Sequence, residues 1–264
     1  MKFGSWVVRE EDEAVCKRLG SETGLLPLTV KLLANRGITS AREAECFLDP
    51  GRIEFHDPFL LADMDAAVAR ITRAINEHER VCIYGDYDVD GVTSTVLLYL
   101  YLRTRGIECE CFIPERLSEG YGLSLPVIER MKGRIDLIIT VDTGVTAVAE
   151  AEYARSVGID MVVTDHHSCR ETLPAAAAVA NPHRSDSKSP FLQLAGVGVV
   201  FKLLCALDGS VERILDMYSD IIALGTIADV MPIIDENRRI TAAGLEKLAK
   251  TENPGLRALM CRSG

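Results

Sequence analysis

The middle of the chain alternates short apolar runs with longer segments of helical periodicity. The apolar runs each contain a β-branched residue and cover residues 81–83, 109–113, 135–141, 160–164 and 176–180. Runs this short and this apolar are typical of strands buried in a sheet. The helical stretches between them are expected at residues 92–105, 125–132 and 146–157. The alternation predicts an α/β fold with a five-stranded parallel sheet and helices on both of its faces.

The first 80 residues lack such runs and predict a mostly helical region. Helices are expected at residues 10–19, 27–36, 40–48 and 65–79. Ser40 and Glu43 have the spacing of a capping box, which marks the start of the third helix. Beyond the predicted sheet, the pattern becomes helical again at residues 199–207 and 210–228.

Three aspartates follow the first predicted strand, in the sequence YGDYDVDG at residues 84–91. Asp86, Asp88 and Asp90 are expected on the turn between the strand and the next helix, where open α/β sheets bind ligands. Carboxylates clustered in this way repel one another unless a cation neutralises them. A polar turn with Asp90 or Thr93 as a helix cap is the plain alternative.

The spacing of these aspartates also suggests the start of an EF-hand calcium loop. Such a loop requires a glutamate at its twelfth position. Counting from Asp86 or from Asp88, the twelfth residue is Leu97 or Tyr99. The EF-hand interpretation therefore fails.

Residues with acidic or imidazole side chains also follow the ends of other predicted strands and of one helix. Asp142 follows the third strand, and Asp165, His166 and His167 follow the fourth, while Asp229 follows an apolar helix. Parallel strands bring such ends to one edge of the sheet. An oxygen-rich set with imidazole suits Mn²⁺ or Mg²⁺ better than zinc. Each motif alone could be a turn, a core histidine or a helix end, but together they predict a two-metal site bridged by Asp142.

Composition restricts the remaining classes. The apolar fraction of 48% is ample for a large core, and no stretch is long enough to span a membrane. The N-terminus lacks a signal-peptide pattern, which favours a cytoplasmic protein. The eight cysteines form no Cys-x-x-Cys pair and are interpreted as reduced core residues. The net charge of −10 is unfavourable for binding the phosphate backbone of a nucleic acid. A chain with this net charge can still carry a local basic face.

Four motifs together resemble those of the DHH phosphoesterase superfamily: YGDYDVDG, VDTG, TDHH and IADV. The intervening stretches IPER, EGYGLS, NPH and LAGVGV, at residues 113–116, 119–124, 181–183 and 194–199, are similar to the RecJ family of bacterial exonucleases. The resemblance implies hydrolysis of single-stranded DNA from the 5′ end with two Mn²⁺ or Mg²⁺ ions, in DNA repair and recombination.

The resemblance also implies roles for individual residues. The implied metal ligands are Asp88, Asp90, Asp142, His166 and Asp229. Asp86 and Asp165 would support the ligands, and His167 would donate a hydrogen bond to the scissile phosphate. Arg116 and Tyr121 are expected to contact the DNA strand by phosphate pairing and base stacking, with a purely structural role in the loop as the alternative. Gly196 and Gly198 could bring a helix N-terminus near a phosphate, with close helix packing as an equal alternative.

The resemblance divides the chain into a helical region at 1–80, a DHH catalytic domain at 81–235 and a helical connector at 236–264. The connector would lead to C-terminal domains that this chain lacks, so we expect a fragment that binds metal yet degrades DNA poorly. Single-stranded DNA is the implied partner, with a repair helicase or a single-strand-binding protein as candidates and no membrane. Two alternatives stay open. One is an enzyme of the same fold with another substrate, either a phosphodiesterase for very short oligonucleotides or cyclic dinucleotides, or a pyrophosphatase. The other is a non-catalytic replication scaffold.

Overall fold

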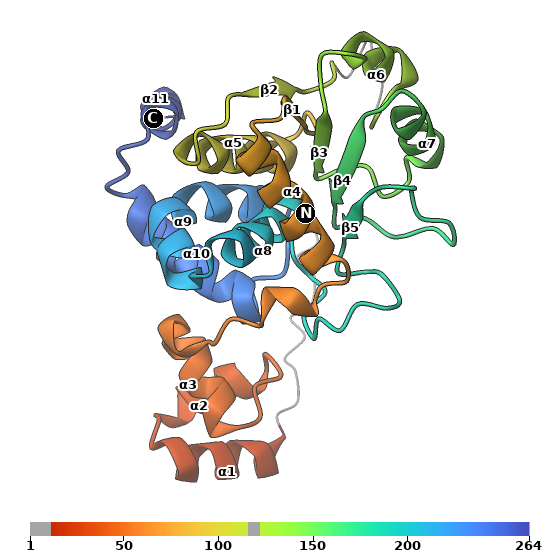
Figure 1. Ribbon diagram of the computed structural model, residues 1–264. Coiled ribbons are helices and arrows are strands. Elements are labelled where there is room, and N and C mark those ends of the chain that lie inside the picture. The colour runs from red at the N-terminus through yellow and green to blue at the C-terminus, as the bar shows by residue number, and fades with distance from the viewer. Residues whose placement is uncertain (1–11, 116–121, 264) are drawn as a thin grey trace, which may run out of the picture. The chain divides into compact units, whose positions relative to one another are not determined.

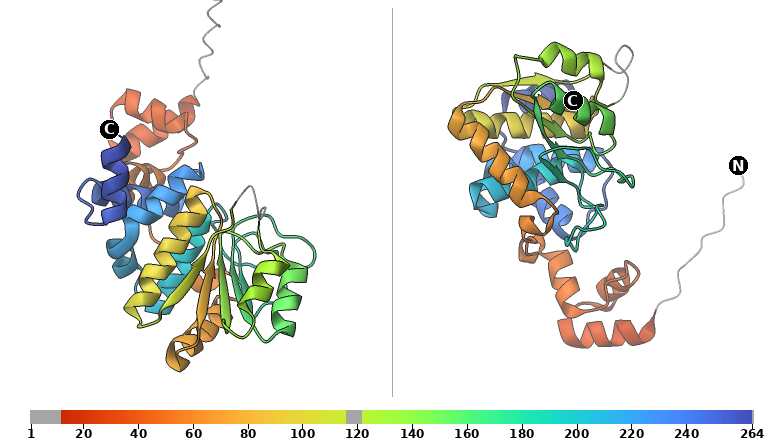
Figure 2. Two further views of the ribbon diagram at one scale, coloured as in Figure 1. Left: turned by 90° about the horizontal axis from the view of Figure 1, so that it is seen from above. Right: turned by 45° about the vertical axis from the view of Figure 1, so that its right-hand side comes forward.

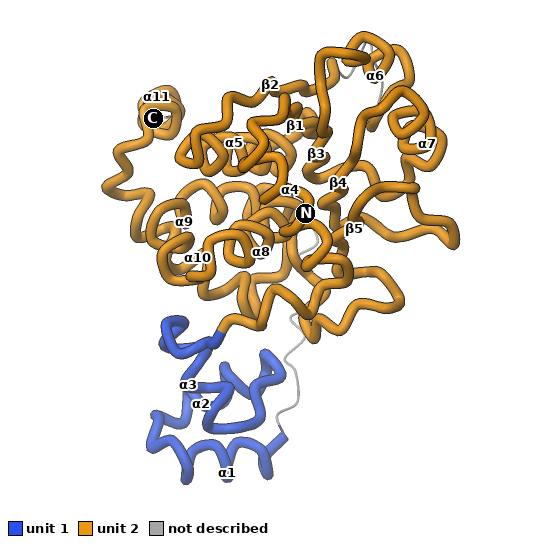
Figure 3. Tube along the Cα trace, viewed as in Figure 1, with its two compact units in different colours: residues 1–54 blue, residues 55–264 orange. Residues whose placement is uncertain are grey.

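The computed structural model describes residues 12–115 and 122–263. The chain divides into two compact units, residues 1–54 and residues 55–264 (Figure 3). Each unit is described by itself. The division into a helical region, a catalytic domain and a connector stays a prediction.

The first unit is helical, as predicted. It contains α1 (Glu13–Thr23), α2 (Pro27–Ala34), α3 (Ala41–Leu48) and the 3₁₀ turn η1 (Pro50–Arg52). The Ser40 capping box is present, since the Ser40 hydroxyl accepts the Glu43 N–H and the Glu43 carboxylate accepts the Ser40 N–H. The first helix was predicted too early, because the Asp12 carboxylate accepts two backbone N–H groups and starts α1 at Glu13. The helices share a small core of Leu19, Val30, Leu33 and Ala44.

The second unit is built on a sheet of five parallel strands (Figure 1). The strands are β1 (Val81–Tyr84), β2 (Cys109–Phe112), β3 (Leu137–Val141), β4 (Asp160–Thr164) and β5 (Ala178–Ala180). Their order across the sheet is β2-β1-β3-β4-β5, and every neighbouring pair is parallel. The predicted fold class is confirmed.

Helices cover both faces of the sheet, as the left view of Figure 2 shows. One face packs against α4 (Met64–Glu77), α5 (Val89–Thr104) and α8 (Gly196–Asp208), and the other against α6 (Leu125–Met131) and α7 (Val148–Ser156). The pleat of β1 explains its continuous apolar run, because Val81 and Ile83 enter the first core while Cys82 and Tyr84 enter the second.

Three further helices complete the unit: α9 (Val211–Ala228), α10 (Asp235–Leu248) and α11 (Pro254–Ser263), together with the short turn η2 (Pro58–Leu60). Among the described residues, no helix is both long and apolar enough to cross a bilayer. All eight cysteines carry free thiols.

The start of α5 corrects one prediction. The helix was expected from residue 92 but begins at Val89, because the Asp88 carboxylate accepts the Gly91 N–H and caps it. The alternative cap at Asp90 or Thr93 is therefore wrong, and Asp90 lies inside the first helical turn.

Candidate metal centre

The strand order determines where a site can form. The chain runs from β1 outward to β2 and then returns to β3 on the other side of β1, so the order reverses between β1 and β3. Open α/β sheets bind ligands beyond the carboxyl ends of strands at such a point. Tyr84 pairs with Thr140, and Val141 pairs with Thr164, so β1, β3 and β4 end side by side. The three motifs that follow these strands are thereby brought together.

The ligand atoms converge as the strand ends require. Within residues 12–115 and 122–263, three groups of side chains each hold their ligand atoms within 4.8 Å of one another. The groups are Asp86, Asp88 and Asp142; Asp142, His166 and His167; and Asp90, His166 and Asp229. The five residues expected to bind metal are all among them, and Asp142 and His166 each belong to two groups.

His166 links the contributions of three separate segments. Its Nε2 atom lies 3.1 Å from Oδ1 of Asp142 and 3.8 Å from both Oδ2 of Asp90 and Oδ2 of Asp229. Asp229, which ends α9, is thus placed beside residues of the sheet edge. No local pattern in the sequence shows this contact.

Asp142 is buried and held in an unusual backbone conformation. It is 1% exposed, and its φ of 60° lies in the left-handed region. A non-glycine residue in this region is uncommon and often marks a functional site. Gly196 makes room for it, since a Cβ atom on Gly196 would lie 2.5 Å from Oδ1 of Asp142. Close packing is therefore one reason for glycine at position 196.

The N-terminus of α8 holds Asp90. The Gly196 N–H donates to Oδ2 of Asp90 at 2.6 Å, and the Val197 N–H donates to Oδ1 at 2.8 Å. These two donors of the helix thus bind a carboxylate of the chain itself, which the positive end of the helix dipole favours. Gly198 lies further into the helix, where an added Cβ would lie 3.2 Å from the Leu194 side chain.

Asp165 organises the histidine pair behind the ligands. Its Oδ1 atom accepts the His166 N–H, the His167 N–H and Nδ1 of His167 at 2.8 Å, and its Oδ2 atom accepts the Val145 N–H. Burial alone would raise the pKa of Asp165, but its hydrogen bonds and its attraction to His167 outweigh burial and lower the pKa. The same hydrogen bond raises the pKa of His167. His167 therefore retains its proton to a higher pH than an ordinary histidine.

Asn181 is a residue of this site that the sequence analysis did not assign. It follows β5, is fully buried, and donates from Nδ2 to the His167 carbonyl at 2.9 Å. Its Oδ1 atom accepts the His183 N–H at 2.7 Å. The NPH stretch was visible in the sequence, but an asparagine after a strand is also an ordinary turn residue.

Burial and mutual repulsion raise the pKa values of several carboxylates in the site. Burial, and then the charges of Asp90 and Asp88, raise the pKa of Asp142 to about 10. Burial raises the pKa of Asp90 to about 6 despite its hydrogen bonds to α8. Burial also raises the pKa values of Asp86 and Asp229. A bound divalent cation would reverse these shifts by favouring the ionised forms.

Buried oxygen atoms provide a test of whether a cation fits. Within the described residues, neither Oδ1 of Asp142 nor Oδ2 of Asp229 makes a hydrogen bond, although both atoms are buried. Buried polar atoms are nearly always satisfied, so orphaned carboxylate oxygens require another partner. The oxygen-rich donor set, with imidazole added, matches the preference of Mn²⁺ and Mg²⁺. The residues fit such ions.

Two predicted contacts cannot be placed. Arg116 and Tyr121 lie outside the described residues, so their roles stay predictions.

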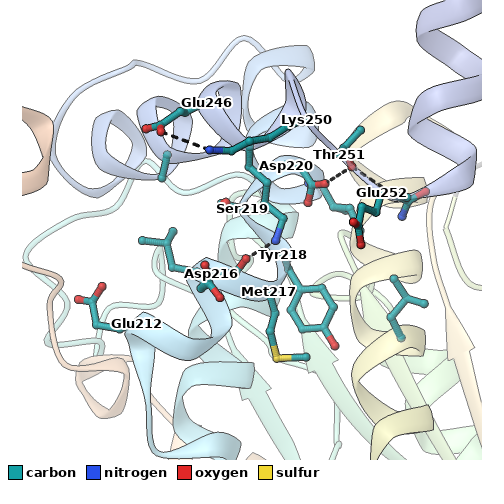
Figure 4. A pocket seen from close by; sticks show the side chains of 16 residues that line it. Glu212, Asp216, Met217, Tyr218, Ser219, Asp220, Glu246, Lys250, Thr251 and Glu252 are labelled. Carbon is teal, nitrogen blue, oxygen red and sulfur yellow. Dashed lines mark hydrogen bonds and ion pairs between the residues drawn. The ribbon is translucent and has the colours of Figure 1, made fainter.

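A cavity of about 690 Å³ lies elsewhere, lined mainly by α9, α10 and the residues after α10 (Figure 4). There Asp220 accepts the Thr251 hydroxyl, and Lys247 donates to the Asp216 carbonyl. None of the site residues that the structure describes lines this cavity. The chemistry therefore lies at the sheet edge and not in this cavity.

Comparisons with known proteins agree with the geometry. Residues 80–226 match the DHH family, N-terminal domain. The single-stranded-DNA-specific exonuclease RecJ of Bacillus subtilis is 42% identical over 260 residues, which cover 98% of this chain and 33% of that protein. The RecJ of Escherichia coli is 37% identical, and the match covers 89% of this chain and 43% of that protein. The chain thus spans less than half the length of these relatives.

A solved structure of similar fold extends the comparison. The crystal structure of Thermus thermophilus RecJ in complex with Mn²⁺ superposes with a TM-score of 0.78 at 29% identity, over 96% of this chain and 36% of that one. The resemblance inferred from the four motifs is confirmed. Because the match at residues 80–226 spans more than half of the 264 residues, the chain belongs to the DHH family.

Proposed function

We propose that this chain is the catalytic part of a metal-dependent exonuclease that hydrolyses single-stranded DNA from the 5′ end. The observation that carries the proposal is the convergence of Asp88, Asp90, Asp142, His166 and Asp229 at one sheet edge. The names of the similar proteins, single-stranded-DNA-specific exonucleases, support the choice of substrate. The chain retains every residue of the expected ligand set, which disfavours a non-catalytic scaffold.

The cofactor would be two Mn²⁺ or Mg²⁺ ions. Asp142, which shares ligand groups with both Asp88 and His166, would be the bridging carboxylate. Asp90, His166 and Asp229 would complete one position, and Asp88 with Asp142 the other. Ions bound there lower the pKa of an attacking water and stabilise the charge that develops on the phosphate. A similar solved structure, of an exonuclease RecJ, contains bound manganese, which supports this assignment.

The residues of the chain itself would prepare the site. The α8 N-terminus holds Asp90 with two N–H donors, so this carboxylate needs little reorganisation on metal binding. Asp165 fixes the ring of His167, and the hydrogen bond to Asp165 raises the pKa of His167, which favours the protonated imidazole. A protonated imidazole at this place would donate to a phosphate oxygen and stabilise its negative charge.

DNA binding would depend partly on polypeptide beyond this chain. The similar RecJ proteins are more than twice as long as the part matched here, and the net charge of −10 offers little general attraction for a phosphate backbone. C-terminal domains of the same polypeptide would close the site. Arg116 and Tyr121 would contribute phosphate pairing and base stacking. A repair helicase or a single-strand-binding protein would be a candidate partner for this activity.

A substrate panel tests the proposal. Single-stranded and duplex DNA, each labelled at the 5′ or the 3′ end, would be compared with dinucleotides and cyclic dinucleotides in Mn²⁺ under single-turnover conditions. We expect mononucleotides released from the 5′ end of single strands, with duplexes cut far more slowly. Faster hydrolysis of dinucleotides or cyclic dinucleotides would overturn the substrate assignment.

A further inference from the structure

The residue that follows the Asp229 ligand is an exposed and strained valine. Val230 is 86% exposed, the highest value among the large apolar side chains of the described residues. Its φ of 58° lies in the left-handed region, where a β-branched residue is a genuine outlier. The left-handed backbone costs stability, and the exposed side chain gains no burial to offset that cost, so the valine requires an explanation outside the fold.

The local backbone shows that glycine would suit this position better. The Val230 N–H donates to the Ile227 carbonyl, and the Met231 N–H donates to the Thr226 carbonyl. This is the Schellman arrangement that ends many helices, and its left-handed position is usually glycine. The turn is therefore well formed, and the valine side chain is the unusual part of it.

The turn lies at the edge of the metal centre. Consecutive Cα atoms are about 3.8 Å apart, so Val230 is the immediate neighbour of Asp229, whose Oδ2 atom lies 3.8 Å from Nε2 of His166. Other apolar side chains of this segment are also exposed, since Ile227 is 44% and Ile234 is 52% accessible. The segment that carries Asp229 thus exposes several apolar side chains to solvent.

We propose that Val230 contacts a nucleobase of the single-stranded substrate, next to the phosphate that is cleaved. This inference rests on the proposed function. A phosphate held by the metal ligands brings its own nucleotide within reach of the neighbouring residue. Base faces are apolar, and aliphatic side chains pack on them or wedge between them in many nucleic-acid complexes. Single strands present such faces, whereas the stacked bases of a duplex do not.

Substitution by glycine separates this role from a structural one. Val230→Gly should raise Tm by about 2–4 °C, because it relieves the left-handed strain. It should also lower kcat/KM for single-stranded DNA by about 5- to 10-fold, because base contacts of this kind are lost. Mn²⁺ affinity should stay within twofold. A variant that is more stable yet less active cannot be explained by damage to the fold.

His78→Gly is the matched control. His78 also has a left-handed φ, 53°, in a Schellman arrangement, where the His78 N–H donates to Ile75 and the Glu79 N–H donates to Ala74. It ends α4 just before β1 begins, at the sheet edge opposite to the metal centre. His78→Gly should raise Tm similarly and leave kcat/KM unchanged.

Abasic substrates test the identity of the contact. Two substrates are compared, one without the base of the first nucleotide and one without the base of the second. For the substrate that lacks the base contacted by Val230, kcat/KM of the unmodified chain should fall by the same factor as Val230→Gly causes on intact DNA. On that substrate the variant should show no further loss, because the contact between Val230 and the base is already absent. The proposal would be overturned if the loss from Val230→Gly and the loss from base removal multiplied for both abasic substrates. It would also be overturned if kcat/KM of Val230→Gly on intact single strands stayed within twofold of the unmodified chain. Either result would indicate that Val230 contacts another polypeptide or nothing. Failure of the unmodified chain to hydrolyse single strands would instead contradict the proposed function, and this inference with it.

Discussion

Nε2 of His166 lies 3.1 Å from Oδ1 of Asp142, although the two residues follow different strands. The contact joins the ends of β3 and β4, which are neighbours in the sheet. Within the described residues, Oδ1 of Asp142 makes no hydrogen bond of good geometry, so its contact with His166 does not satisfy this oxygen in place of a metal ion. A carboxylate and an imidazole that lie this close, with the carboxylate oxygen lacking a hydrogen bond, are suited to bind a cation together.

Asp142→Asn should abolish metal binding and activity while the fold persists. The amide keeps the size of the side chain but removes its charge, so we expect Mn²⁺ affinity to fall at least about 100-fold. The metal-free variant should be as stable as the unmodified chain or more so, because burial and nearby carboxylates already raise the pKa of Asp142 to about 10. Calorimetric Mn²⁺ titration and thermal unfolding measure both effects.

Asp136→Asn provides the control for this substitution. Asp136 precedes β3 at the opposite edge of the sheet and pairs with Arg80 at 2.6 Å. Its loss should lower stability slightly and leave Mn²⁺ affinity unchanged. Near-normal turnover by Asp142→Asn in an otherwise active protein would contradict the bridging role.

The metal-free chain should lose stability as the pH rises from about 4 to above 6. Burial raises the pKa of Asp90 to about 6, so the folded chain binds this proton more tightly than the unfolded chain, whose aspartate pKa is about 3.9. The stabilising contribution is complete below the unfolded value and is lost as the pH passes the folded value. The raised pKa of His167 acts in the same direction.

Thermal unfolding between pH 4.5 and 7.5, with EDTA or with saturating Mn²⁺, measures this dependence. With EDTA, Tm should fall across the range. With Mn²⁺, which replaces the proton, the difference in Tm between the two conditions should grow with pH. A metal-free Tm that rises over this range would contradict the electrostatic account.

Gly196→Ala should weaken metal binding, whereas Gly198→Ala should not. A Cβ on Gly196 would press within 2.5 Å of Asp142 and displace the carboxylate, so we expect a loss of about 10- to 100-fold in Mn²⁺ affinity. A Cβ on Gly198 would lie 3.2 Å from Cβ and Cδ2 of Leu194, a milder contact that involves no carboxylate of the site. Calorimetry on the two variants compares them directly. Equal affinities would show that close packing on Asp142 does not matter.

Asn181→Asp should impair turnover more than metal binding. The substitution keeps the acceptor for the His183 N–H but replaces the donor to the His167 carbonyl with a carboxylate oxygen. His167 would lose one of its anchors, so we expect kcat to fall about 10-fold with Mn²⁺ affinity within threefold. NMR of the His167 ring reports its position independently of activity. Unchanged ring signals and an unchanged kcat would exclude a positioning role.

The sheet and the candidate ligands at its strand ends could be predicted from sequence because each of these signals is local, whereas the place of Asp229 beside them was only implied by the resemblance. Apolar runs locate the strands, and acidic or imidazole groups at their ends meet because parallel strands share an edge. Asp142 and His166 illustrate this. The start of α5 was misplaced, since Asp86, Asp88 and Asp90 can all cap a helix and only the folded backbone selects Asp88.

Other features depend on contacts between distant residues. For the α8 N-terminus, a nearby phosphate and close helix packing were left open as equal alternatives. The sequence did not predict that its Gly196 and Val197 N–H groups bind Asp90, more than a hundred residues earlier. The left-handed conformation of Val230 is equally invisible, because its helix ends without the glycine that usually marks such a turn. Local patterns carry no information about either feature.

A crystal of the chain soaked in Mn²⁺, with anomalous scattering measured, tests the central claim most directly. We predict two peaks, roughly 3.5–4 Å apart, with a carboxylate oxygen of Asp142 bound to each. A single ion, two ions that do not share Asp142, or no ion at saturating Mn²⁺ would contradict the account.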